Sequence, residues 1–204
     1  MPKWTKWLAI TIVVVIIIFN IGSWVSGTYN ALVTTNELVS NRFADIEAQY
    51  QRRMDLIPNI VETVKGSAGF EQSTLQQVVA ARSAWAQAKS AGNVAGQFAA
   101  ANAFDSSLSR LLVTIEAYPN IKSTQAFSDL TTALEGTENR IAVARRDYNE
   151  AVKNYNLKTK TFPSNLIAGM YDFEPKTFFE ADSGAKKAPD VKFDFNPTTS
   201  PATK

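Results

Sequence analysis

The N-terminal part of the chain is a long apolar segment without charge. Residues 7–36 contain no Lys, Arg, Asp or Glu, and residues 8–19 are almost continuously aliphatic. Trp4 and Trp24 flank this core, about 30 Å apart along a helix. That length matches the hydrocarbon thickness of a bilayer, and tryptophans are typical of its two interfaces. A cleaved signal peptide has a shorter apolar region. The pattern therefore predicts a cytoplasmic stub and a retained transmembrane anchor over residues 1–27.

Beyond the anchor the apolar positions take up helical spacing. Two sets of side chains recur at intervals of seven residues. The first set is Tyr29, Asn36, Phe43 and Tyr50, and the second set, which follows three residues later each time, is Leu32, Val39 and Ile46. This pattern predicts that a single helix continues out of the membrane to about Met54. Pro58 marks the next boundary, because proline is tolerated only in the first turn of a helix.

Three further helices follow in the pattern. The second carries apolar residues on one face from Ile57 to Trp85, and Gly66 and Gly69 lower its propensity and would bend it. A turn at 90–93 separates it from the third helix. The fourth has an aromatic or aliphatic residue at every seventh position from Phe127 to Phe162. We therefore expect an all-α fold, in which the transmembrane helix continues into a long antiparallel bundle of about four helices.

The bundle domain is expected to span residues 28–182. Phe162-Pro163 breaks the fourth helix, and residues 164–169 have the pattern of a short helix. A mostly flexible tail follows over 183–204, rich in Lys, Pro and Thr, in which Val191–Phe195 alternates as a short strand or an extended clip would.

Composition narrows the functional classes. The chain has no Cys and no His, so the usual nucleophilic, general-base and zinc-binding side chains are missing, and we expect no cofactor or metal. The 21 Lys and Arg exceed the 19 Asp and Glu by two, and Lys3 and Lys6 account for that excess. The rest of the chain is neutral, which argues against nucleic acid as a partner.

The position of Lys3 and Lys6 also predicts an orientation. They precede the apolar segment, and the first basic residue after it is Arg42. The positive-inside rule then places the N-terminus in the cytoplasm and the bundle outside, with a single pass through the plasma or inner membrane.

Two groups of polar residues are candidates for an interaction surface. Arg52, Arg53 and Asn59 lie around the first turn of the bundle, where they would form a docking surface or simply a solvated end. Arg145 and Arg146 belong to a dense charged stretch of the fourth helix. Such a stretch is usually a solvated face with weak ion pairs, and its alternative role is to bind lipid phosphate or an acidic partner.

Asn36 and Glu71 interrupt otherwise apolar stripes. If the first two helices form a hairpin that turns near residue 55, positions whose numbers sum to about 110 face each other. Asn36 and Glu71 would then lie within a turn of each other. We expect a buried polar contact between them that fixes the register of the two helices, as polar seam residues do in coiled coils. A catalytic role for Glu71 is the alternative.

Several blocks of the sequence resemble the LemA family of bacterial membrane proteins. In order along the chain, these blocks are Tyr29–Val33, Arg52–Lys65, Ala144–Asn156, Phe162–Ala168 and Phe178–Ala181. Gly69-Phe70-Glu71 departs from the pattern, because members tend to carry a polar residue before the glutamate. The resemblance covers roughly residues 28–195 and implies an N-terminal anchor with a long antiparallel bundle. It implies no reaction, cofactor or catalytic residue.

These observations together predict a membrane-anchored helical scaffold or adaptor in the bacterial envelope. Its partners would be the lipid bilayer and either further copies of itself or another membrane or envelope protein. The alternative from a different class is an envelope enzyme, or its accessory subunit, that works through carboxylates, since carboxylates, Lys and Tyr are the chemistry left to a chain without His or Cys.

Overall fold

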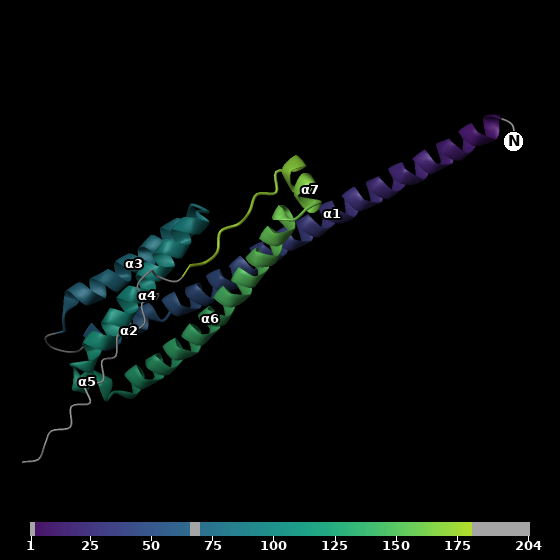
Figure 1. The fold of residues 1–204 in the computed structure, drawn as a ribbon. Helices are drawn as coiled ribbons and strands as arrows, with labels where there is room; N and C mark the ends of the chain where they lie inside the picture. The colour runs from purple at the N-terminus through teal and green to yellow at the C-terminus, as the bar shows by residue number, and fades with distance from the viewer. Residues whose placement is uncertain (1–2, 66–69, 181–204) are drawn as a thin grey trace, which may run out of the picture.

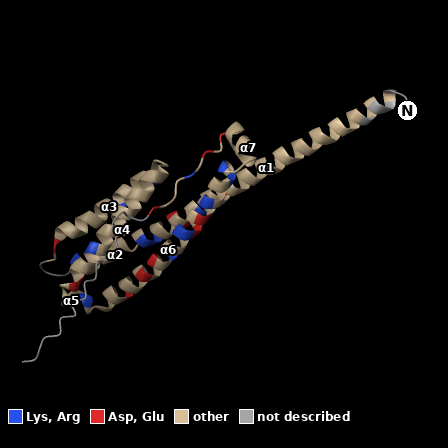
Figure 2. Cartoon of the chain, in the orientation of Figure 1, with Lys and Arg blue, Asp and Glu red and all other residues tan. Residues whose placement is uncertain are grey.

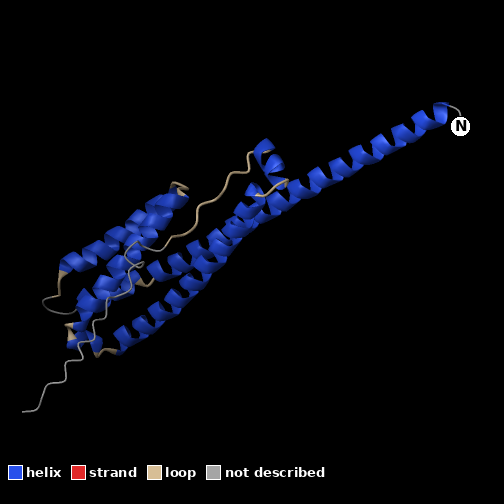
Figure 3. Cartoon of the chain, in the orientation of Figure 1, coloured by secondary structure: helices blue, strands red, loops and turns tan. Residues whose placement is uncertain are grey.

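The computed structural model describes residues 3–65 and 70–180, and in these residues it contains seven helices and no strand (Figures 1 and 3). The helices are α1 Lys3–Met54, α2 Ile57–Lys65, α3 Gln72–Ser90, α4 Val94–Glu116, α5 Pro119–Lys122, α6 Gln125–Lys160 and α7 Ser164–Met170. The predicted all-α class is confirmed. The predicted tail over 183–204, with its Val191–Phe195 clip, lies outside the described residues.

Helix α1 is one uninterrupted helix of 52 residues, about 78 Å long. Its N-terminal part projects away from the rest of the molecule, and its aliphatic side chains are exposed (Figure 1). Among the described residues, this is the helix that is long and apolar enough to cross a membrane. The side chains of Thr11 and Asn20 donate to carbonyls one turn back, those of Trp7 and Ile16. These polar groups are thus satisfied within the apolar segment.

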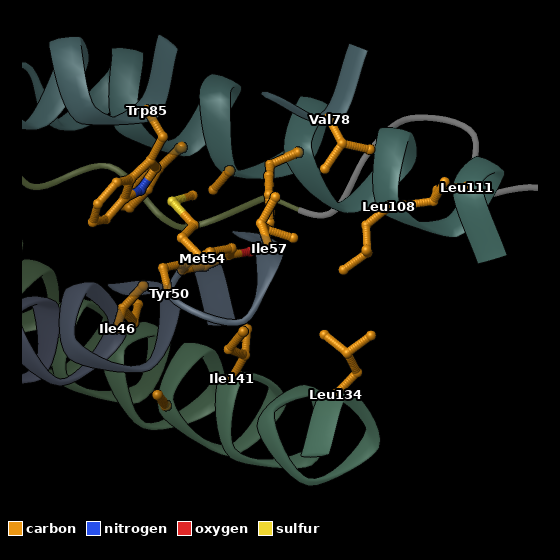
Figure 4. Packing of buried hydrophobic residues seen from close by; sticks show 14 of the residues in the cluster. Ile46, Tyr50, Met54, Ile57, Val78, Trp85, Leu108, Leu111, Leu134 and Ile141 are labelled. Carbon is orange, nitrogen blue, oxygen red and sulfur yellow. The ribbon is translucent and has the colours of Figure 1, made fainter. Parts of the chain in front are cut away.

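The bundle is built from two helix pairs. Helix α1 packs along α6, and α3 packs along α4, next to the C-terminal part of α1 (Figure 1). The buried core joins both pairs, and Figure 4 shows Tyr50 and Met54 of α1 between Ile141 of α6 and Trp85 of α3. Burial of such side chains, each worth about 2 kcal/mol, is what holds the pairs together.

The second predicted helix is two helices. Helix α2 ends at Lys65, α3 begins only at Gln72, and residues 66–69 lie outside the described residues. The glycines at 66 and 69 explain the break, since each costs about 1 kcal/mol relative to alanine in a helix. Helix α6 packs along α1, whereas α3 lies antiparallel beside only the C-terminal part of α1, where the ring of Trp85 lies 6.4 Å from that of Tyr50 and Lys89 pairs with Glu47.

The predicted contact between Asn36 and Glu71 is consequently wrong. It assumed that the chain turns near residue 55, whereas α2 continues to Lys65 before α3 returns, so that Tyr50 faces Trp85 and Glu47 pairs with Lys89. Glu71 is exposed immediately before α3, where its carboxylate accepts a hydrogen bond from the Ser73 hydroxyl. Asn36 lies partly buried on α1.

The seven-residue pattern of the fourth predicted helix is correct up to Tyr155. Leu134, Ile141, Tyr148 and Tyr155 are all buried on α6. Phe162 was expected to extend this buried row and does not, because α6 ends at Lys160 and the Phe162 side chain is 78% exposed. The short helix expected at 164–169 is present as α7.

Helix α6 carries charged side chains of both signs along its length, whereas α1 carries none between residues 7 and 36 (Figure 2). The side-chain carboxylates and guanidiniums are therefore concentrated in the bundle, and most of them lie on its surface. One group of them is partly buried, with Arg53 at its centre.

Candidate functional site

A carboxylate lies at the junction of three helices. Asp105 is on α4, one turn from the buried residues Ala101 and Leu108. It therefore lies on the face of α4 that packs into the core, and its carboxylate points toward α1 and α6. The hydroxyl of Tyr50 donates to Asp105 Oδ2 at 2.7 Å. The guanidinium of Arg53 donates to Oδ1 at 2.8 Å. Both oxygens of the carboxylate are thus held by α1.

Helix α6 completes this arrangement with one residue of each sign. Arg145 Nη2 lies 2.5 Å from Asp105 Oδ2 and also donates to the Tyr50 hydroxyl. Arg53, whose side chain is only 8% exposed, uses its other nitrogen to pair with Glu138 Oε2 at 2.6 Å. We call these five residues, Tyr50, Arg53, Asp105, Glu138 and Arg145, the ion cluster. Its two carboxylates balance its two guanidiniums, and it ties α1, α4 and α6 together.

Burial dominates the electrostatics of the ion cluster. It raises the pKa of Asp105 from its ordinary value of 3.8 to about 7; Arg53 opposes this shift and Glu138 adds to it. Burial also lowers the pKa of Arg145 to about 10, so this guanidinium still carries its charge at neutral pH. The Nε atoms of Arg53 and Arg145 are buried and have no hydrogen-bond partner among the described residues. Desolvated charges of this kind are costly unless they are paired.

The ion cluster also contacts the C-terminal segment of the described chain. We call residues 173–180 the strap; it runs in extended conformation back along the bundle from α7 (Figure 1). The ring of Phe179 is buried, with its centroid 4.4 Å from the guanidinium carbon of Arg145 and 4.4 Å from the ring of Phe98 on α4. Arg145 is therefore held between a carboxylate on one side and an aromatic face on the other.

Two asparagines of α6 hold the backbone of the strap. Asn149 accepts from the Phe179 amide at 2.8 Å and donates to the Phe179 carbonyl at 3.0 Å. Asn156 makes the same pair of bonds with Lys176, both at 2.8 Å. The Tyr148 hydroxyl donates to the Thr177 carbonyl between them. The strap thus has the backbone partners that a neighbouring β-strand would otherwise supply.

The predicted interaction residues fall into two groups. Arg53 and Arg145 belong to the ion cluster, so the expectation that they are available to a partner is wrong for the buried Arg53, and Arg145 is mostly covered. Arg52, Asn59 and Arg146 are exposed. Arg52 lines a groove between the C-terminal end of α1 and α6 together with Leu56 and Thr137. The role of these three exposed residues as an interaction surface stays a prediction.

Sequence reasoning missed Asp105, Asn149 and Asn156. A signal existed for each. Asp105 follows Ala101 by four residues and precedes Leu108 by three, which places it on the apolar stripe of α4. The dipeptide Tyr-Asn occurs at 148–149 and again seven residues later at 155–156, so each asparagine lies beside a core tyrosine. Both asparagines fall within the Ala144–Asn156 block on which the family resemblance rests.

The part of the chain that holds the ion cluster and the strap matches a known protein family. The LemA family model matches residues 42–193, which include the ion cluster and the strap. Magnetosome protein MamQ 2 of Paramagnetospirillum magneticum is 28% identical over 175 residues, and magnetosome protein MamQ of Magnetospirillum gryphiswaldense is 25% identical over 174 residues. Each alignment covers 74% of this chain and 64% of the relative, so the chain spans less than two thirds of these MamQ proteins.

A third relative has the family's own name. Protein LemA of Metamycoplasma hominis is 24% identical over 155 residues, which are 76% of this chain and 70% of that protein. The family model itself covers well over half of the chain. The chain belongs to the LemA family.

Proposed function

We propose that this protein is a membrane-anchored scaffold or adaptor of the bacterial cell envelope. In this proposal α1 spans the plasma or inner membrane once, the N-terminus lies in the cytoplasm, and the bundle lies outside. The bundle assembles with further copies of itself or holds another membrane or envelope protein at a set distance from the bilayer.

The continuity of α1 is the observation that carries this proposal. One helix provides both the exposed apolar segment and, through residues such as Val39, Ile46 and Tyr50, a wall of the bundle core. A flexible linker would let a domain move freely beside the membrane, whereas an unbroken helix transmits its direction to the bundle. The ion cluster adds to this rigidity, because it joins α1, α4 and α6 through charged hydrogen bonds.

The exposed residues Arg52 and Asn59 lie on either side of the turn between α1 and α2, in the part of the bundle that is remote from the apolar segment of α1. A surface there would meet its partner about 40 Å from the membrane, since some 28 residues of helix separate Arg52 from Trp24. Arg146 offers a second exposed guanidinium on α6. Acidic groups on the partner would complement both.

One observation favours an enzyme that works through a carboxylate. Asp105 has a pKa near 7, the range in which a general acid or base operates. Its two oxygens, however, already accept hydrogen bonds from Tyr50, Arg53 and Arg145. Three of the four acceptor positions of this carboxylate are thus occupied by side chains of the bundle, and we therefore assign it to structure.

The scaffold is tested by cross-linking in native membranes, followed by gentle extraction of the C-terminally tagged chain and measurement of its mass. We expect a discrete multimer, or one second protein at fixed stoichiometry. Arg52→Glu combined with Arg146→Glu should weaken that product, and Lys153→Glu, an equally exposed change on α6, should leave it intact. A monomer without a partner in every sample would overturn the proposal.

The orientation is tested separately. Because the chain has no cysteine, Val113→Cys introduces a single exposed thiol on α4. A membrane-impermeant maleimide should label it in intact cells if the bundle lies outside. Labelling only after the membrane has been opened would place the bundle in the cytoplasm.

A further inference from the structure

Helix α7 packs against α1 just after Trp24, in the C-terminal part of the uncharged segment 7–36. Ile167 and Ala168 of α7 are buried against Leu32 of α1, with Val25 beside them. The ring centroid of Tyr171, at the end of α7, lies 4.9 Å from that of Tyr29. The position of α7 along α1 is thus set by packed side chains and not by the loop that precedes it.

Several apolar side chains of α7 and of the residues next to it are exposed. Phe162, Leu166 and Met170 follow one another at intervals of four residues, and their side chains are 78%, 54% and 72% exposed. Tyr171 is exposed by half. Single exposed apolar residues are ordinary on a protein surface, but a contiguous group of this kind marks a contact site. We call these four residues the foot.

The foot lies at the level where a bilayer would end. Trp24 is the last tryptophan of α1, at the border of the apolar segment. The two residues of α1 beside α7, Val25 and Leu32, are about 2 Å and 12 Å further along the helix. The polar layer of a bilayer is about 5–8 Å thick on each side. The Val25 end of the contact between α1 and α7 therefore lies at the height of the headgroups and of the border with the acyl chains, and the Leu32 end lies a few Å outside them.

The charges around the foot are of both signs. Lys158 lines a groove with Trp24 and Ser164, and Lys160 is exposed two residues later. Asp172, Glu174 and Lys176 are exposed in the segment that follows α7. Charges of both signs give little preference for an anionic surface, so insertion of apolar side chains would drive binding here.

We propose that α7 with its foot is a second membrane contact, which lies in the interface of the leaflet from which α1 emerges and inserts its apolar side chains among zwitterionic phospholipids. The bundle is then attached at two points, the spanning helix and the foot. Two points fix both the tilt of the bundle and its rotation about α1. The inference rests on the membrane anchor and is independent of any scaffold partner.

Spin labels on single cysteines test this inference. The full chain carries one label at Met170→Cys, at Val113→Cys or at Ile16→Cys, and is reconstituted into phosphatidylcholine vesicles. Val113 is a matched control, because it is 67% exposed on α4, in the bundle, and Ile16 lies within the apolar segment. Collisions with oxygen, which concentrates in the bilayer, are compared with collisions with a water-soluble nickel chelate.

We expect the ratio of oxygen to nickel collisions at Met170 to exceed that at Val113 severalfold and to stay below that at Ile16. Replacing a fifth of the lipid by phosphatidylglycerol should leave the ratio unchanged. A ratio at Met170 equal to that at Val113 would overturn the inference, and so would spin–spin broadening at Met170, which would show that a second copy covers the foot. A water-accessible label at Ile16 would overturn the anchor itself.

Discussion

Asn149 and Asn156 lie seven residues apart on one face of α6, and each side chain binds both backbone groups of one strap residue. Seven residues of helix measure about 10.5 Å, and the three extended residues from Lys176 to Phe179 measure about 10 Å. The two spacings match, so both amides reach their partners at once. Because the bonds are made to backbone, they fix the position of the strap without specifying its side chains.

Asn149→Ala should release the strap. The Phe179 amide and carbonyl lose their partners, and each such loss costs about 1 kcal/mol or more. We expect hydrogen exchange at the Phe179 amide to become about tenfold faster or more, because that rate follows the local opening free energy. Asn154→Ala, which changes an exposed asparagine of the same helix, is the control. Equal exchange rates in the two variants would contradict this role.

Arg145→Lys should destabilise the bundle more than Arg146→Lys does. A lysine retains the charge but loses the planar fork that reaches Asp105 and the flat face that lies over Phe179. We expect a loss of about 2 kcal/mol in the free energy of unfolding for Arg145→Lys. The neighbouring Arg146 is 72% exposed, and its replacement should cost less than about 0.5 kcal/mol. Urea unfolding of the full chain in detergent micelles, followed by circular dichroism, measures both.

Asp105→Ala should be the most damaging single change in the ion cluster. It leaves the guanidiniums of Arg53 and Arg145 without their shared carboxylate, and removing one partner of a buried ion pair costs about 3–5 kcal/mol. Asp45→Ala provides the control, since Asp45 pairs with Arg42 on the exposed side of α1 and should cost less than about 1 kcal/mol. Similar losses in both variants, by the same urea unfolding, would show that the ion cluster adds nothing to stability.

The stability of the bundle should fall as the pH rises from about 4 to about 7. Burial raises the pKa of Asp105 from 3.8 to about 7, so between these values the folded chain holds a proton that the unfolded chain releases. The slope contributed by this group is at most about 1.4 kcal/mol per pH unit and vanishes above the folded pKa. The difference in unfolding free energy between the parent chain and Asp105→Asn, measured across this range, isolates the contribution of this group. If the parent chain instead gains stability relative to that variant as the pH rises, the pKa of Asp105 is lowered in the folded chain. The two guanidiniums then affect this pKa more than burial does.

The local elements could be predicted from the sequence because their signals are local. Heptad spacing identified the course of α1 to Met54, and the Phe162-Pro163 break identified the end of α6. The pairing of the helices could not be predicted in the same way. The α1 stripe contacts α6 and, near its C-terminal end, also α3, and no local signal in the sequence fixes where along α1 the returning α3 lies.

The ion cluster depends on the same long-range geometry. Arg53 is 52 residues from Asp105, and Arg145 is 40 residues from it, so sequence spacing alone brings none of them together. What the sequence does show is a charged residue on an apolar stripe, as at Asp105. That pattern predicts a buried partner without naming it. The heptad pattern marked Tyr148 and Tyr155 as core, but nothing local revealed that the adjacent asparagines bind a segment twenty to thirty residues away.

Because α1 is uninterrupted, its length also fixes how the bundle is rotated about the membrane normal. Each residue of a helix turns the next by 100°, so one residue inserted between Trp24 and Leu32 would rotate the whole bundle by that angle about the membrane normal. Seven inserted residues would return it to within about 20° of its original azimuth while lifting it about 10 Å. The length of this helix therefore sets which side of the bundle faces a neighbour in the plane of the membrane.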